Sequence, residues 1–120
     1  MIVGERMPLH QKVVEDLAEV FGVLSHPTRV RILAFLHATE HDVSELRAHL
    51  GISAANVSQH LAILRSRHLV KVRREGTRVF YSTGDPRVAE LINCALDFLD
   101  EDMSHTGEVR EAIREVRLQS

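Results

Sequence analysis

The sequence contains one cysteine, no tryptophan and few aromatic residues, which make up 4% of its 120 residues. Because Cys94 has no second cysteine to pair with, the chain forms no internal disulfide, which suits a reducing compartment. No apolar run approaches the roughly 20 residues that span a bilayer, and the N-terminus lacks an apolar core followed by a small-residue cleavage site. We therefore expect a cytoplasmic protein with no membrane partner.

Motifs that carry enzyme chemistry are also missing. The sequence has no glycine-rich phosphate loop, no His-Glu-x-x-His, and no cysteine or serine placed beside a base. We therefore expect no catalytic activity. A length of 120 residues and a hydrophobic content of 44% fit one domain, with a core over about residues 9–102 and a tail or short C-terminal helix over 103–120.

The net charge of −2 hides a division along the chain. Between residues 47 and 78, seven Lys and Arg stand against one Glu, whereas between 85 and 108 seven Asp and Glu stand against one Arg. The basic middle favours contact with a polyanion. The acidic end offers a docking surface for a regulatory partner protein.

Apolar residues at helical spacing predict two helices at the start of the chain. Residues 9–24 place Val13, Leu17 and Phe21 on one stripe. Pro27 suits the first position of a second helix, "PTRVRILAFLHA", because a residue there needs no N–H donor.

Two short helices are then predicted over 43–50 and within 53–69. Gly51 suits the left-handed residue that follows a helix, and the Ser53 hydroxyl can accept a hydrogen bond from the first turn of the next helix. Two short helices joined in this way form a helix-turn-helix.

After Leu69 the pattern changes to alternation, which predicts a hairpin of "LVKVRR" and "RVFYST" around Gly76. A further apolar helix is predicted over 85–102. The tail over 107–120 is either a short amphipathic helix or frayed. The sequence thus predicts a mainly α winged helix-turn-helix with about five helices and a two-stranded β-hairpin.

The fourth predicted helix has an unusual outer face. Val57, Leu61 and Leu64 form its inner stripe, but the outer residues are small or carry amides and hydroxyls where a solvated helix carries Glu and Lys. Such a helix is slim enough for the major groove and offers hydrogen bonds to base edges. The predicted DNA contacts are Ser53, Ala55, Asn56, Ser58 and Gln59 on the helix, Arg65 and Arg67 at its end, and Arg73, Arg74 and Arg78 on the hairpin.

The stretches "LSHPTRVRILAFL" and "VSQHLAILR…LV…RREGTRVFYS" resemble the ArsR/SmtB family of bacterial winged-helix repressors, over about residues 12–102. The resemblance implies a homodimer that sits on a palindromic operator in double-stranded DNA and leaves when an inducer binds, often a metal ion. It also implies that Ala54 faces bases together with the helix residues named above, and that the hairpin arginines face phosphate.

The dimer is also expected from the residues themselves. The last helix is more apolar than one side of a small core requires, and the first helix is similar. We expect the dimer interface to contain Leu17, Phe21, Leu91, Ile92, Ala95, Leu96 and Leu99.

The metal sites of the family are not retained whole at the matching positions. Asp42-Val43-Ser44 stands where the resemblance places a Cys-x-Cys. On the last helix Asp85 and Glu101 keep the acids that the resemblance implies, but Arg87 and Phe98 stand in place of its histidines. Arginine and phenylalanine do not ligate zinc or nickel, so we expect this site to be lost.

Two alternatives therefore remain for what releases the protein from DNA. One is control by a partner protein. The other is a nonstandard nickel or zinc site, for which the candidate ligands are His10, His37, His41, Cys94 and His105. For Cys94 we expect packing as a small buried hydrophobe, with metal or redox sensing as the alternative.

Overall fold

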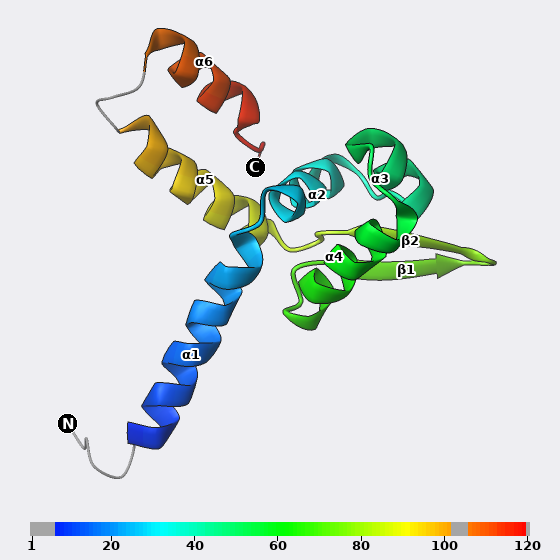
Figure 1. The fold of residues 1–120 in the computed structure, drawn as a ribbon, viewed down its shortest axis with the longest axis horizontal. Coiled ribbons are helices and arrows are strands. Elements are labelled where there is room, and N and C mark those ends of the chain that lie inside the picture. Colours follow the sequence, from blue (N-terminus) through cyan, green and yellow to red (C-terminus); the bar gives the residue numbers. More distant parts are fainter. Residues whose placement is uncertain (1–6, 102–105, 120) are drawn as a thin grey trace.

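A computed structural model describes residues 7–101 and 106–119 of the chain. The described residues form six helices and one antiparallel hairpin (Figure 1). In chain order these are α1 (Met7–Leu24), α2 (Pro27–Ala38), α3 (Val43–Leu50), α4 (Ala54–Ser66), β1 (Lys71–Glu75), β2 (Arg78–Ser82), α5 (Pro86–Asp100) and α6 (Gly107–Val116). The predicted winged helix-turn-helix architecture is confirmed.

The core lies where α2, α3 and α4 meet beside the hairpin. Leu33 of α2, Leu46 of α3 and Leu64 of α4 are completely buried there. Burying a leucine side chain contributes about 1.5–3 kcal/mol relative to leaving it exposed. Since Val57 and Leu61 bury the same face of α4, the opposite face of this helix is turned to solvent.

Local hydrogen bonds set the ends of the helix-turn-helix. Gly51 has a φ of 68° and its N–H donates to the Arg47 carbonyl at 2.8 Å. The Ser53 hydroxyl accepts from the Asn56 N–H at 3.2 Å. Both predicted roles are confirmed. The cap of α3 was not predicted: Asp42 and Glu45 each accept from the other's backbone N–H and form a capping box.

The hairpin is tied to the segment that precedes α3. Its strands pair from Lys71 opposite Ser82 to Glu75 opposite Arg78, and the two-residue turn begins at Gly76, whose φ is 60°. The N–H and C=O of His41 both pair with Tyr81 on the outer edge of β2, at 3.0 and 2.8 Å. The hairpin therefore has a defined position relative to the helix-turn-helix.

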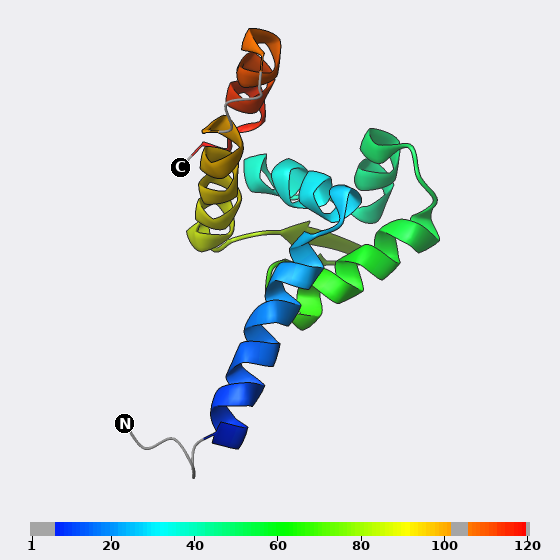
Figure 2. The same cartoon turned by 60° about the vertical axis from the view of Figure 1, so that its left-hand side comes forward.

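Helices α1, α5 and α6 lie outside this core. α1 projects away from the rest of the protein, and α6 folds back beside α5 (Figures 1 and 2). The tail after α6 is held by Asn93, whose side chain donates to the Leu118 carbonyl at 2.7 Å and accepts from the Leu118 N–H at 2.9 Å. Of the two alternatives for this tail, the structure shows the helix. No helix in the described ranges has the length and apolar character required to cross a bilayer.

Cys94 is exposed, and the expectation that it is buried was wrong. The buried stripe of α5 follows Val88, Ile92 and Leu96 at intervals of four residues. Two residues along a helix is more than half a turn, so Cys94 lies on the opposite side from Ile92.

Candidate nucleic-acid interface

The outward face of α4 carries the side chains predicted to read DNA bases. All of them are exposed: Ser53, Ala54, Ala55, Asn56, Ser58 and Gln59. None is charged, so this face can approach phosphates without repulsion and still offers hydrogen-bond donors and acceptors. The hydroxyl of Ser53 is partly committed, because it already caps α4.

A groove of about 340 Å³ runs between α4 and the hairpin. Ser58, Ala62 and Arg65 line this groove from α4, and Tyr81 lines it from β2. Tyr81 was not among the predicted DNA contacts. The alternation of side chains along a strand could have found it, because it places Tyr81 and Val79 on one face of the hairpin.

The hairpin separates its three arginines between two faces. Directly opposed residues of paired strands point to the same face, and Arg74 is opposed to Val79. Arg74 therefore shares a face with Tyr81, the face that borders the groove. Its side chain is exposed, and within the described ranges it has no ion-pair partner.

Arg73 and Arg78 lie on the other face and are held there by acidic residues near α3. Arg73 donates to Glu40 at 3.0 Å, and Arg78 donates to Asp42 at 2.7 Å. Both guanidinium carbons lie over the Phe80 ring, 4.7 and 4.6 Å from its centre, within cation–π range. Hydrogen bonds from the arginines hold the pKa values of Glu40 and Asp42 below their ordinary values. Arg73 and Arg78 thus attach the hairpin to the helix-turn-helix.

Arg65 and Arg67 stand two residues apart and face in different directions. Arg65 is exposed and borders the groove. The side chain of Arg67 is only 26% exposed, donates to Glu19 and lies 3.9 Å from Asp16, both of which belong to α1. Its guanidinium therefore faces α1, which differs from the outward position predicted for it.

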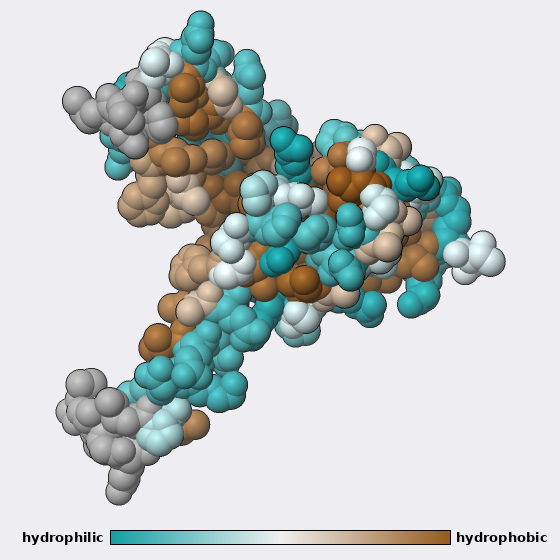
Figure 3. Space-filling model, in the orientation of Figure 1, coloured by the Kyte–Doolittle hydropathy of each residue, from teal (hydrophilic) through white to brown (hydrophobic). Residues whose placement is uncertain are grey.

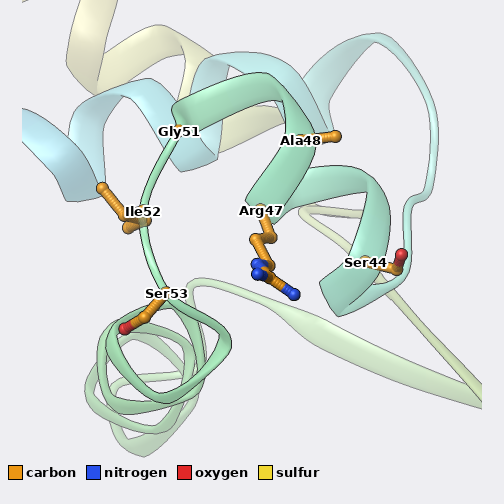
Figure 4. Close-up of a pocket in the computed structure, with 6 residues that line it drawn as sticks. All are labelled: Ser44, Arg47, Ala48, Gly51, Ile52 and Ser53. Carbon is orange, nitrogen blue, oxygen red and sulfur yellow. The ribbon is translucent and has the colours of Figure 1, made fainter.

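A second concave surface, of about 690 Å³, lies between α3 and the start of α4. Arg47 extends from α3 into this hollow, with Ser44 and Ser53 on either side of it (Figure 4). Arg47 contributes to the basic middle of the sequence but was not selected as a site residue. Its exposed position on the first helix of a helix-turn-helix is the signal that was overlooked, because that helix crosses the DNA backbone in such motifs.

The residues at the metal position of the last helix form an ion pair. Asp85 accepts from the guanidinium of Arg87 at 2.7 Å and also caps α5 through the Arg87 N–H at 2.9 Å. These hydrogen bonds lower the pKa of Asp85 to about 2. Because a guanidinium stands where an imidazole ligand is needed, the residues present do not fit a metal ion at this position.

The candidates for a nonstandard metal site lie apart. His41 sits 3.0 Å from Glu45 and stacks on Phe35. His105 falls outside the described residues. Within residues 7–101 and 106–119, no three His, Cys, Asp or Glu side chains come together to hold an ion. The remaining candidates lie on separate helices: His10 on α1, His37 on α2 and Cys94 on α5.

Exposed apolar side chains gather along one edge of α1 and on the neighbouring side of α5 (Figure 3). Leu17 and Phe21 on α1 are 55% and 57% exposed, and Leu99 on α5 is 50% exposed. Together with Leu91 and Ala95, which are also exposed, they form an exposed apolar surface of the kind that mediates protein–protein contacts.

Two members of the predicted dimer interface are largely buried within the protomer. Ile92 and Leu96 are each only 8% exposed and belong to its core. The reason is that α5 turns this stripe towards α2, with which it makes direct contact. Both residues also line an apolar hollow together with Phe21 and Leu91.

Comparisons with known proteins agree with this geometry. The family model described as "Bacterial regulatory protein, arsR family" matches residues 26–72. The uncharacterized HTH-type transcriptional regulator Rv0081 of Mycobacterium tuberculosis is 38% identical over 98 residues, which cover 81% of this chain and 86% of that protein. A transcriptional repressor SmtB homolog of Synechocystis is 40% identical over 97 residues, covering 81% of this chain and 72% of that protein.

Solved structures extend the likeness to the fold. The crystal structure of Rv0081 matches with a TM-score of 0.71 at 36% identity, covering 77% of this chain and 93% of that one. The homodimeric winged helix-turn-helix DNA-binding domain Mb0332 of Mycobacterium bovis, solved by NMR, matches with a TM-score of 0.71 at 30% identity, covering 80% and 89%. The protein described here therefore belongs to the ArsR/SmtB family of winged helix-turn-helix transcriptional regulators, which bind DNA and are not enzymes.

Proposed function

We propose that this chain is a single-domain, homodimeric repressor that acts in the cytoplasm on a palindromic operator and is released by an inducer. In this proposal α4 enters the major groove, and Ser58 and Gln59 hydrogen-bond to base edges. The observation that carries the proposal is the uncharged, exposed face of α4, with Arg65 lining the groove beside it and Arg47 extending into the hollow at its start.

Phosphate contacts are assigned to the arginines that the fold leaves exposed. Arg65 lines the groove beside α4, Arg74 lies on the same hairpin face as Tyr81, and Arg47 extends into the hollow at the start of α4. Contacts of this kind set the register of the protein on the duplex without reading sequence. Arg73 and Arg78 act mainly on the position of the hairpin, because carboxylates already hold them.

Dimerisation is assigned to the apolar surface of α1 and α5. Leu17 and Phe21 stay more than half exposed in the protomer, because α1 projects away from the rest of it (Figure 2). An apolar hollow of about 330 Å³ between α1 and α5, lined by Phe21 and Leu91 among others, can receive side chains of a second copy. Two-fold symmetry then places two reading helices about 34 Å apart, one turn of DNA.

A DNA titration tests the proposal. The protein is used to select duplexes from a randomised pool, and its affinity for the selected duplex and for a scrambled version is measured at several salt concentrations. We expect a palindromic selected sequence, a preference of about 10³-fold or more over the scrambled duplex, and a steep decrease of affinity with salt. A protein with neither preference nor salt dependence would be a protein-contact module instead.

We also propose that the signal that releases this protein from DNA is not a metal ion bound at the family's usual positions. It is supported by the Asp85–Arg87 ion pair, which occupies one of those positions. Calorimetry of the dimer with nickel, zinc and cobalt decides between the two alternatives. Binding that weakens the DNA complex would identify a nonstandard ion site, whereas no binding would favour a partner protein, for which the acidic end of the chain offers a surface.

A further inference from the structure

Helix α1 needs a defined direction if it is to set the geometry of a dimer on DNA. It meets the rest of the protomer mainly at its C-terminal end, where Val23 enters the core. An 18-residue helix is about 27 Å long, so a small rotation at that end moves its far end by several ångströms. The direction of α1 therefore depends on contacts away from this attachment point.

Arg67 makes such a contact. It follows the last residue of α4, and its guanidinium donates to Glu19, about one turn before Val23 on α1, with Asp16 3.9 Å away. The side chain is only 26% exposed, far less than that of Arg65. One end of the reading helix is thus bonded to the flank of the helix assigned to the dimer interface.

Arg29 joins the same two helices at the attachment point itself. Its Nη1 donates to the Val23 carbonyl at the end of α1, at 3.0 Å, and its Nε donates to Nδ1 of His60 on α4, at 3.3 Å. The carbonyls of a last helical turn lack partners within the helix, so this bond also completes the end of α1. With Arg29 bonded at Val23 and Arg67 bonded about one turn earlier at Glu19, the C-terminal part of α1 is held at two successive turns.

We propose that Arg67 is a positioning residue: by bonding to Glu19 it holds α1 at a fixed angle to α4, and so sets the distance between the two reading helices of the dimer. This inference rests on the proposed function, in which α1 joins the protomers and α4 reads the DNA. It assigns Arg67 to the spacing of the half-sites and removes it from the phosphate contacts.

The alternative role for Arg67 is a contact with a DNA phosphate. The two roles predict opposite effects of Glu19→Gln on the affinity for DNA. If Arg67 bonds to phosphate, Glu19 competes with the DNA, and Glu19→Gln frees the arginine and strengthens binding. If Arg67 positions α1, Glu19→Gln weakens binding to a correctly spaced operator. An exposed ion pair contributes at most about a fivefold change in an equilibrium constant. Because the dimer loses two pairs, we expect a loss of roughly fivefold to tenfold.

The experiment uses Glu19→Gln, Arg67→Gln and the double variant, with a palindromic duplex selected from a randomised pool by the wild-type protein. Affinities are measured for that duplex and for versions with one base pair inserted or deleted between the half-sites. One base pair moves a half-site by about 3.4 Å and rotates it by roughly 35°. We expect both single variants to lose affinity for the duplex with the original spacing. Their affinity for the duplexes with altered spacing should change little. The double variant should lose no more than either single variant, since all three remove the same bond.

Matched controls separate the bond from the charge. Glu15→Gln removes an equal charge one turn earlier on α1, where the carboxylate accepts only from Gln11 in the described structure. Arg65→Gln removes a neighbouring arginine that borders the groove. We expect Glu15→Gln to leave the spacing preference unchanged and Arg65→Gln to weaken binding equally at all spacings. Thermal unfolding verifies that each variant is folded.

Three outcomes overturn the inference. Stronger binding by Glu19→Gln would assign Arg67 to phosphate, and an equal loss by Arg67→Gln at every spacing would do the same. A spacing preference that all variants retain would show that α1 is held by other contacts. These results differ from failure of the proposed function, in which the wild-type protein itself selects no palindromic duplex.

Discussion

Arg78 donates a hydrogen bond of 2.7 Å to Oδ2 of Asp42, whose other oxygen accepts from the Glu45 N–H at 2.8 Å. One carboxylate thus caps α3 and also holds the second strand of the hairpin. The hairpin and the helix-turn-helix are joined through this side chain, so loss of the carboxylate affects both.

We expect Asp42→Ala to lower the free energy of unfolding by about 1–2 kcal/mol, because a helix cap and an ion pair are removed together. Arg78→Ala should lower it by less, since the cap remains. The two changes should not add fully, because they share one bond. Urea unfolding of both single variants and the double variant measures this; fully additive effects would show that the two side chains act independently.

The two faces of the hairpin predict different effects for its arginines. Arg74→Ala should weaken binding to all DNA sequences alike and reduce the salt slope by about 1 for each phosphate that is no longer neutralised, with unchanged thermal stability. Arg73→Ala should lower thermal stability, because it breaks the bonds to Glu40 and Glu75. Salt titrations and thermal unfolding of both variants check this division. An equal effect of the two variants on both measurements would contradict it.

The proposed role of the outer face of α4 in reading bases leads to a prediction about sequence specificity. Gln59→Ala and Ser58→Ala should each reduce discrimination between the operator and a mismatched duplex by about 1–3 kcal/mol for each base that the side chain no longer reads. Binding to nonspecific DNA should change little, because neither side chain is charged. Competition binding with single-base variants of the operator measures the effect. A uniform loss on specific and nonspecific DNA would remove these residues from base recognition.

The apolar surface of α1 predicts how the dimer can be disrupted. Leu17→Glu places a charge on a surface that is 55% exposed in the protomer and would be buried between two copies, where an unpaired charge is strongly unfavourable. We expect a folded monomer with operator affinity reduced at least about 100-fold, since only one half-site is bound at a time. Sedimentation analysis and DNA titration test this. A variant that stays dimeric would move the interface away from α1.

His60 predicts a pH dependence of stability. Burial, followed by the nearby charges of His26 and Arg29, lowers the pKa of His60 from its ordinary value of 6.5. The unfolded chain therefore takes up this proton before the folded chain does. The stability linked to His60 is fully present above about pH 6.5 and is lost as the pH falls through the lower folded pKa, where protonation also removes the acceptor used by Arg29.

Urea unfolding of the wild-type protein and of His60→Gln, from about pH 5 to about pH 8, measures this dependence. We expect the difference between the two proteins to shrink on the acidic side. A difference that stays constant with pH would show that the proton on His60 is not linked to folding.

Local chemistry explains why so much of the fold could be predicted from the sequence. Pro27, Gly51 and Ser53 act on the backbone of residues close to them in the chain. Their effects on where helices begin and end therefore do not depend on tertiary contacts. The inner and outer faces of α4 are likewise set by the spacing of Val57 and Leu61 along one helix. The reading face was predictable for that reason.

Contacts between distant parts of the chain were not predictable in this way. Arg67 pairs with Glu19, 48 residues earlier, and Arg73 pairs with Glu40, 33 residues earlier. In the sequence they carry the same charge as Arg65 and Arg74, which stand only one or two residues away, and nothing local names the distant carboxylate that each one pairs with.

The sequence by itself therefore determined where the helices begin and end, which side of α4 is free of charge, and that the middle of the chain is basic. Only the tertiary structure decided which arginines pair with distant carboxylates, and that Ile92 and Leu96 belong to the protomer core. The physical reason is that a side chain's hydrogen bonds and burial depend on the neighbours that packing brings to it, whereas periodicity and capping depend only on residues close in the chain.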